Sequence, residues 1–340
     1  MKKLLFTIML ILVFSTVFVS CKKDKDPETL KIGLVTGLGT LTDRGFNQQA
    51  YEGLLTAAAE TNSEWDVRES LNLDQVESNI AYFCDNKFDV IITMTYDASQ
   101  VTQDAALAHP DIKFILLDHS IADPPANLAC VTYQIDQVSF QAGFLAAWWA
   151  DKVNHSEAMV GYVAGPQIPN ILQFTQSLSA GIDYFNNQYA LAVNISGAYA
   201  TAFNDTLQGA QMAGLLIQDG ADIIFACAGK TGNGALYQAK NSGVVSIGVD
   251  TDQYLTIPEV GSILLTSCMK RLDQSIYQEI LAISAGQFHG GTTTIASLTS
   301  NGVELAPFHD FENQVPDSIR LALSNIRQGI INGSINTGWE

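Results

Sequence analysis

The stretch Val35-Thr-Gly-Leu-Gly-Thr-Leu-Thr-Asp-Arg-Gly-Phe-Asn47 follows a short apolar run and leads into a helix-like pattern. Two further stretches have the same setting, Ala228-Gly-Lys-Thr-Gly-Asn-Gly234 and Gly248-Val-Asp-Thr-Asp-Gln253. A fourth, Cys268-Met-Lys-Arg-Leu-Asp273, places a lysine at the end of another apolar run. Loops at strand ends are where open α/β sheets bind ligands. The four stretches therefore predict an α/β protein with a small-molecule site.

The same alternation of apolar run and helical pattern extends along most of the chain. The predicted strands are apolar on both faces, as strands buried in a parallel sheet must be. They are expected at Lys31–Thr36, Val90–Thr95, Lys113–Asp118, Leu128–Tyr133, Met159–Ala164, Ala192–Gly197, Ile223–Ala228, Val244–Val249 and Ile263–Cys268. Helices are expected at Phe46–Thr61, Gln75–Asn86, Ser99–His109, Gln137–Val153, Gln173–Asn186, Thr206–Gln218, Asn233–Ser242 and Arg271–Ala285. Because right-handed βαβ crossovers follow from this alternation, the sheets should be mainly parallel.

This many strands would be large for a single core, so the pattern predicts two Rossmann-like lobes with a hinge and a cleft between them. The chain is expected to leave the first lobe near 133–136. The strand at 263–268 and its helix are expected to complete the first sheet, with a second crossing near 250–258. The expected lobes are then 30–133 plus about 255–300, and 134–254 plus about 301–340. Closure of two lobes over a cleft is a known way of trapping a ligand.

The N-terminus has the pattern of an export signal. Lys2 and Lys3 precede the apolar run Leu4–Val19, which is short for a membrane-spanning helix. Cys21 follows a small residue, as the lipidated cysteine of a lipoprotein signal does, so residues 1–21 are expected to be such a signal. A diacylated Cys21 would be a stable anchor, and the charged segment 22–29 a tether. The predicted location is outside the cytoplasm, anchored to a bacterial membrane; an ordinary membrane-anchor helix is the alternative.

The composition excludes several classes of function. The chain of 340 residues carries a formal net charge of −18, which nucleic-acid backbones and anionic lipid headgroups would repel. No nucleic-acid partner is therefore expected. The histidines and cysteines show no metal-ligand spacing, so we expect no metal and no cofactor. The cysteines other than Cys21 are expected to be small buried apolar side chains, at Cys84, Cys130, Cys227 and Cys268.

Aromatic and charged side chains stand at the predicted strand ends and helix starts. Phe46 and Phe203 occupy matching places in the two halves and could sandwich a flat ring, although core packing is the alternative for each. Stacking of this kind is worth about 1–3 kcal/mol per base. Asp118 and Asp250 directly follow apolar runs, where a carboxylate is costly unless it is paired or solvated. If the Lys270 ammonium reaches Asp250, the nearly neutral pair could hold the vicinal hydroxyls of an uncharged polyol or nucleoside.

The four stretches, in this order and at this spacing, resemble the basic membrane protein family of purine-nucleoside receptor lipoproteins. Members of that family act as substrate-binding components of ABC importers. The resemblance extends from Leu30 to Glu340. It implies the type I periplasmic-binding-protein architecture, a non-enzymatic receptor, a nucleoside ligand and a membrane permease as partner. It also implies a set of ligand-binding residues, with Asn47 either contacting the ligand or capping its helix: Phe46, Asn47, Asp118, Phe203, Gly229, Asp250 and Lys270.

One position departs from the family pattern and keeps other functions open. The family has an aspartate where this chain has Gly37, and that aspartate is expected to read hydrogen-bond donors on the base. A shifted ligand, such as a sugar or another small polyol, therefore remains an alternative. A nucleoside-processing enzyme is a second one, because carboxylates and a lysine suffice for acid–base chemistry. The chain has no G-x-S-x-G motif and no cysteine–histidine pairing, so we assign no catalytic residue and expect no enzyme.

Overall fold

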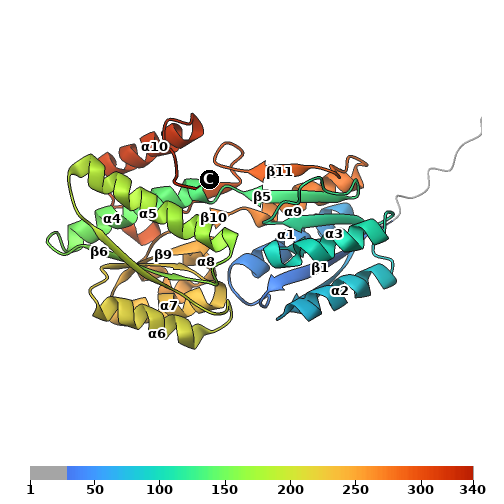
Figure 1. Cartoon of the computed structure of the whole chain (residues 1–340), viewed down its shortest axis with the longest axis horizontal. Helices are drawn as coiled ribbons and strands as arrows, with labels where there is room; N and C mark the ends of the chain where they lie inside the picture. Colours follow the sequence, from blue (N-terminus) through green and yellow to red (C-terminus); the bar gives the residue numbers. More distant parts are fainter. Residues whose placement is uncertain (1–28, 340) are drawn as a thin grey trace, which may run out of the picture.

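The computed structural model describes residues 29–339, which form two α/β lobes side by side (Figure 1). Each lobe is built on one six-stranded sheet. The predicted signal with Cys21, and the predicted tether up to residue 28, lie outside the described residues. The prediction of an α/β fold with two mainly parallel sheets is confirmed.

The first lobe has the strand order β11-β5-β4-β3-β1-β2, and all its neighbouring strands are parallel. The strands are β1 (Lys31–Leu38), β2 (Glu64–Ser70), β3 (Val90–Met94), β4 (Lys113–Leu117), β5 (Leu128–Tyr133) and β11 (Thr293–Ala296). Helices α1 (Phe46–Thr61) and α9 (Leu272–Ser284) pack together on one face. Helices α2 (Leu73–Asp85) and α3 (Ser99–Ala108) cover the other, where η1 (Tyr96–Ala98) precedes α3.

The second lobe repeats the plan with the order β12-β10-β9-β8-β6-β7. Its strands are β6 (Met159–Ala164), β7 (Asn194–Tyr199), β8 (Ile223–Cys227), β9 (Val245–Asp250), β10 (Leu264–Lys270) and β12 (Val303–Leu305). Only the β10–β12 pair is antiparallel. One face carries α4 (Asp136–Val153), α5 (Pro169–Tyr189) and α10 (Asp317–Ile331), and the other carries α6 (Thr206–Gln218) and α7 (Gly229–Ser242). The short elements α8 (Gln253–Thr256), η2 (Pro258–Ile263) and η3 (His309–Phe311) complete it.

Helices α4 and α5 are held at very close range by two glycines. A Cβ atom on Gly143 would lie 2.0 Å from the carbonyl oxygen of Leu178, and one on Gly181 would lie 2.0 Å from that of Phe140. Any side chain at either position would push the helices apart. The two helices are therefore closely packed, and the N-terminal end of α5 reaches the pocket between the lobes.

The placement of β10 differs from the sequence prediction. Segment 263–268 was expected in the first sheet, but β10 pairs in parallel with β9 of the second sheet, with Cys268 beside Val249. The expectation was wrong because both lobes repeat the same βα pattern, so an apolar run does not reveal which sheet it joins. The chain instead crosses at Arg271, and the following α9 lies against α1, where a Cβ on Gly53 would be 2.7 Å from Asp273 Cα.

The interior is apolar and continuous between the lobes. One cluster of buried side chains extends from β1 and α1 of the first lobe to α4, α5 and β10 of the second. The four cysteines within residues 29–339 are unpaired and buried, as the sequence predicted. None of the helices in this part of the chain combines the length and the apolar character that a membrane crossing needs.

Candidate ligand-binding site

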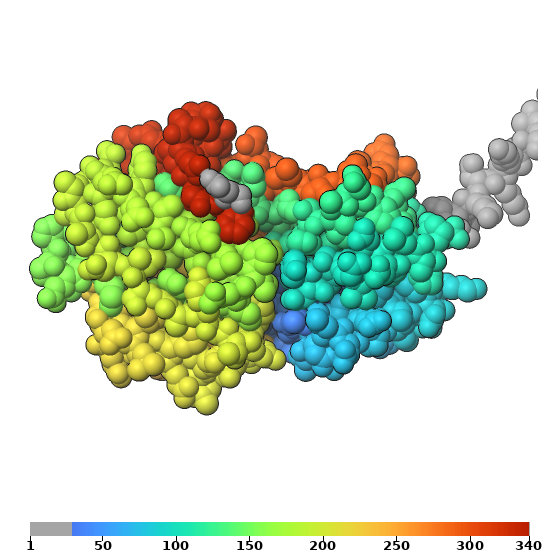
Figure 2. Space-filling model, viewed as in Figure 1, coloured from blue at the N-terminus to red at the C-terminus, as the bar shows by residue number. Residues whose placement is uncertain are grey.

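A pocket lies between the two lobes and encloses about 740 Å³, part of it open to solvent. This is within the usual range for a small-molecule site. Around it the lobes are in contact, as the middle of the molecule in Figure 2 shows. The lining comes from both lobes and includes every residue that the sequence singled out for ligand binding: Phe46, Asn47, Asp118, Phe203, Gly229, Asp250 and Lys270.

These residues meet because they stand at the carboxyl ends of parallel strands, which share one edge of each sheet. The chain turns sharply there: Thr95, Asp118 and Asp250, at the ends of β3, β4 and β9, have φ angles of 76°, 60° and 68°. Aspartate tolerates this left-handed region, whereas a β-branched threonine in it is a genuine outlier. Backbone strain of this kind is typical of functional sites, where the surrounding structure enforces it.

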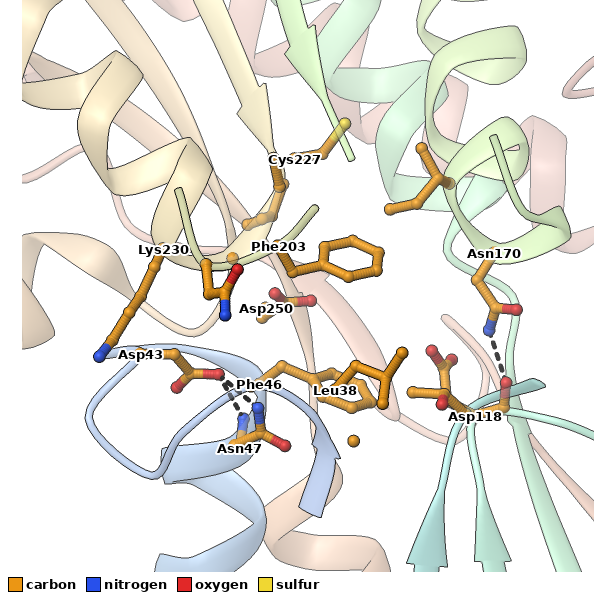
Figure 3. Close-up of a pocket in the computed structure, with 18 of the residues that line it drawn as sticks. Leu38, Asp43, Phe46, Asn47, Asp118, Asn170, Phe203, Cys227, Lys230 and Asp250 are labelled. Carbon is orange, nitrogen blue, oxygen red and sulfur yellow. Dashed lines mark hydrogen bonds between the residues drawn. The ribbon is translucent and has the colours of Figure 1, made fainter. Parts of the chain in front are cut away.

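Phe46 and Phe203 approach the pocket from opposite lobes. Phe46 is the first residue of α1, and Phe203 lies in the loop before α6. Both side chains are half-buried, and Figure 3 shows them on opposite sides of the cavity. Two glycines let the Phe203 segment come close: a Cβ on Gly165 would be 2.2 Å from its ring, and one on Gly229 would be 3.1 Å from its carbonyl oxygen. The two phenyl groups therefore line the same pocket from opposite lobes.

The Lys270 ammonium pairs with Asp118 and not with Asp250. Its Nζ donates to both oxygens of the Asp118 carboxylate, at 2.9 and 2.8 Å, and both side chains are almost completely buried. The expected Lys270–Asp250 pair is therefore wrong. The reason is geometric, because Lys270 extends from the second lobe across the cleft to the end of β4. The ammonium also lies 5.5 Å from the centre of the Phe46 ring.

Asp250 is left with a buried carboxylate that accepts no hydrogen bond from any residue in 29–339. Asp250 as a whole is 8% exposed, and it lines the pocket. Burial, together with the nearby Asp118 and Asp43 carboxylates, raises the pKa of this carboxyl to about 7 against the opposing effect of the Lys270 ammonium. An acceptor in such a position is suited to hydroxyl donors from a ligand.

Asn47 does not cap α1, contrary to one of its two expected roles. The helix begins one residue earlier, at Phe46, and the Asp43 carboxylate accepts hydrogen bonds from the backbone N–H groups of Gly45, Asn47 and Gln48 at 2.8–3.1 Å. Asn47 Nδ2 also donates to Asp43, at 3.0 Å (Figure 3). Burial raises the pKa of the Asp43 carboxyl against the opposing effect of these bonds. Asp43 thus fixes the first turn of α1, and with it the place of Phe46.

The loop between β1 and α1 joins the lobes over the pocket. Lys230 Nζ donates to Thr42 Oγ1 at 2.9 Å, and Asn233 Nδ2 donates to the carbonyl of Asp43 at 2.7 Å. At the rim, Arg44 forms an ion pair with Glu259 at 2.7 Å. Contacts of this kind, made between lobes and around a ligand pocket, are what a hinge-closing protein forms on closure.

The family model described as "ABC transporter substrate-binding protein PnrA-like" (Bmp) matches residues 31–337. The chain belongs to this family. Basic membrane protein A1 of Borrelia garinii subsp. bavariensis is 29% identical, over 98% of this chain and 96% of that protein. The "ABC transporter nucleoside-binding protein BmpA" of Lactococcus lactis subsp. cremoris is 26% identical, over 89% of this chain and 88% of that protein.

Among solved structures, a solute-binding protein of an ABC transporter system from Aeropyrum pernix superposes with a TM-score of 0.84. It is 22% identical, and the match covers 90% of this chain and 92% of that one. The fold is therefore that of the type I periplasmic binding proteins. As a Bmp family member, the chain is the substrate-binding component of an ABC transporter and not an enzyme. It takes a small-molecule ligand and works with a transporter partner.

The Bmp pocket also contains residues that the sequence patterns did not reveal. Asn170 Nδ2, on α5, reaches across the cleft and donates to the Asp118 carbonyl at 2.5 Å (Figure 3). Phe174, one turn later, lies with its ring centre 5.2 Å from Lys270 Nζ. Asp97 and Lys230 also line the cavity. Asn170 could have been found as a residue at the start of the helix that follows the strand Met159–Ala164. That helix was expected at Gln173–Asn186, so Asn170 was left outside it.

The charges of the pocket decide which ligands fit. Four carboxylates line it, at Asp43, Asp97, Asp118 and Asp250, against the ammonium groups of Lys230 and Lys270. An anionic ligand such as a phosphate ester would be repelled by this excess of carboxylates. Within residues 29–339 no group of acidic, histidine or cysteine side chains is arranged to hold a metal ion. The pocket is suited to an uncharged ligand with hydroxyl or N–H donors.

Proposed function

We propose that this protein is a lipid-anchored receptor that delivers a purine nucleoside to its ABC permease. One observation carries the ligand assignment: two phenyl rings from opposite lobes and the unpartnered Asp250 carboxylate line the same pocket. The rings would stack on the base from both sides, and Asp250 would accept hydrogen bonds from the ribose hydroxyls. The nucleoside-binding relative from Lactococcus lactis supports the same ligand class.

A sugar or another small polyol is the second candidate, because of Gly37. The resemblance to the family implies an aspartate at this position that would read the base, and the Cβ that Gly37 lacks would lie 3.4 Å from the Phe46 ring. A ligand without a base would not need that carboxylate. Asp250 would hold hydroxyls in either case, so the two candidates differ in whether the phenyl rings contribute to the affinity.

Isothermal titration of the full-length protein in mild detergent, stripped of co-purified ligand by unfolding and refolding, separates these candidates. We expect guanosine, inosine or adenosine to bind one to one, and ribose alone to bind much more weakly. Phe46→Ala should weaken nucleoside binding by about 10- to 100-fold, since one stacked face is lost. Tyr82→Ala, an exposed aromatic of the same lobe, is the matched control and should change nothing. A folded protein that binds ribose but no nucleoside would support the polyol and refute the nucleoside.

The anchoring part of the proposal rests on the sequence of residues 1–21. We expect the protein to carry acyl chains on Cys21 after export, and to partition into detergent in a phase-separation assay. Cys21→Ser should lose the acyl label and move to the aqueous phase. Cys84→Ala removes a different thiol and should keep the label. An acyl label that survives Cys21→Ser would contradict the anchor at this residue.

A further inference from the structure

Two of the four carboxylates in the pocket are already satisfied by the protein, and two are not. Asp118 is paired with Lys270, and Asp43 accepts four hydrogen bonds from the first turn of α1. Asp250 and Asp97 accept no hydrogen bond and form no ion pair with any residue in the described part of the chain. Asp250 belongs to the second lobe and Asp97 to the first. The pocket thus offers unpartnered acceptors from both lobes to a ligand bound between them.

Asp97 is held in place by the local backbone. It lies in η1, which begins after Thr95 has turned the chain out of β3 with its φ of 76°. Thr95 N donates to the Leu117 carbonyl at 2.8 Å, and Ala98 N donates to the Thr95 carbonyl at 3.3 Å. The Tyr96 ring packs edge-on against His119, with centres 5.1 Å apart. The strained φ of Thr95 persists only because these contacts hold the turn in place. They therefore also fix the backbone position of Asp97.

The turn that carries Asp97 lies next to position 37, and both residues line the pocket. A Cβ on Gly37 would lie 3.2 Å from Thr95 Cγ2, so position 37 faces the turn that leads to Asp97. Burial alone raises the pKa of the Asp97 carboxyl, and no neighbouring donor or cation lowers it. A half-buried carboxylate with nothing to compensate its desolvation is an acceptor prepared for a ligand.

We propose that Asp97 determines base specificity, accepting the two adjacent N–H donors of a guanine-type ring edge in place of the carboxylate missing at Gly37. This inference rests on the proposed function, since it needs a nucleoside between Phe46 and Phe203. A carboxylate offers two acceptor oxygens side by side and binds paired donors in a bidentate manner. Guanine presents a ring N–H next to an amine, hypoxanthine presents the ring N–H alone, and adenine places its amine beside an acceptor nitrogen.

Titrations of the full-length protein with guanosine, inosine and adenosine test this assignment. Wild type should bind guanosine about 10- to 100-fold more tightly than inosine, because one hydrogen bond to a charged group is lost. In Asp97→Asn the guanosine affinity should fall by a similar factor, and the preference over inosine should shrink to within about threefold. Asp111→Asn, an exposed aspartate in the loop before β4, is the matched control and should keep both values.

The outcomes separate this inference from the proposed function. Nucleoside binding by wild type with a guanosine preference that Asp97→Asn leaves intact would overturn the role of Asp97 alone. Preference of wild type for adenosine would do the same. Absence of nucleoside binding by the folded wild type would refute the proposed function and this inference together. A thermal melt of Asp97→Asn within about a degree of wild type would show that any change in preference comes from the site and not from unfolding.

Discussion

Replacing Lys270 by methionine is expected to destabilise the ligand-free protein by about 3–5 kcal/mol. Lys270 and Asp118 form an ion pair with exposed side-chain fractions of 3% and 6%. Methionine preserves most of the apolar stem but leaves the Asp118 carboxylate buried without a counter-charge. It also removes the ammonium that favours ionisation of Asp250. Urea unfolding at pH 8 should show a lower midpoint with an unchanged slope.

A double-mutant cycle identifies the cause of this loss. Adding Asp118→Asn to Lys270→Met removes the uncompensated charge and should restore at least half of the lost stability. Lys230→Met is the matched control, because this half-buried lysine at the same pocket donates only to the Thr42 hydroxyl. We expect it to change the free energy of unfolding by less than about 0.5 kcal/mol. A loss below 1 kcal/mol in Lys270→Met would show that water reaches the Asp118 carboxylate.

The interior strands of both sheets could be predicted from the sequence, but of the edge strands only β7 could. A strand with neighbours on both sides and helices on both faces must be apolar throughout, as in Val90–Met94 and Ile223–Cys227. The three missed strands all lie at sheet edges. In β2, Glu64-Trp-Asp-Val-Arg-Glu-Ser70, most side chains are at least partly exposed, so its sequence resembles a loop.

Part of the pocket lining could be predicted from the sequence, but the pairings within it could not. Strand-end residues and the family resemblance pointed to seven positions that the structure brings into one pocket. Which carboxylate Lys270 would reach depends on how the lobes face each other, and no local pattern contains that information. The same holds for Asn170, whose amide contacts the first lobe from a helix of the second. Asp97 lies after the end of a strand, as Asp118 does. Because two turn residues separate it from that strand, the sequence does not show that it reaches the pocket.

The pairing of Lys270 with Asp118 has a consequence for how the pocket binds its ligand. Because the ammonium is already committed, Asp250 carries a charge that only a ligand can satisfy when the lobes are together. Closure without a ligand leaves that carboxylate buried and unpartnered, whereas hydroxyl donors remove the penalty. The same group therefore couples ligand occupancy to the stability of the closed arrangement, as a receptor that closes on its ligand requires.

We expect Asp250→Asn to stabilise the ligand-free protein at pH 8 while it weakens ligand binding. Burial raises the pKa of Asp250 from 3.8 to about 7, so above pH 7 the folded protein carries an unfavourable charge. The shift of about three units corresponds to at most about 4 kcal/mol. Between about pH 4 and 7 the folded state holds a proton that the unfolded chain has lost, so stability falls as the pH rises. Asparagine removes this cost, and with it the charged acceptor for hydroxyl donors.

Thermal melts at two pH values and one titration check this prediction. Asp250→Asn should raise the melting temperature at pH 8 and raise it less at pH 5, where the folded wild-type carboxyl is still protonated and only the first part of the cost has accumulated. Nucleoside affinity at pH 8 should fall by at least about tenfold, as expected for hydrogen bonds to a charged group. Asp219→Asn, an exposed aspartate after α6, should alter neither quantity. Equal destabilisation of Asp250→Asn at both pH values would contradict this prediction. It would mean that the Asp250 carboxylate already has hydrogen-bond partners in the ligand-free protein, so ligand binding would relieve no penalty.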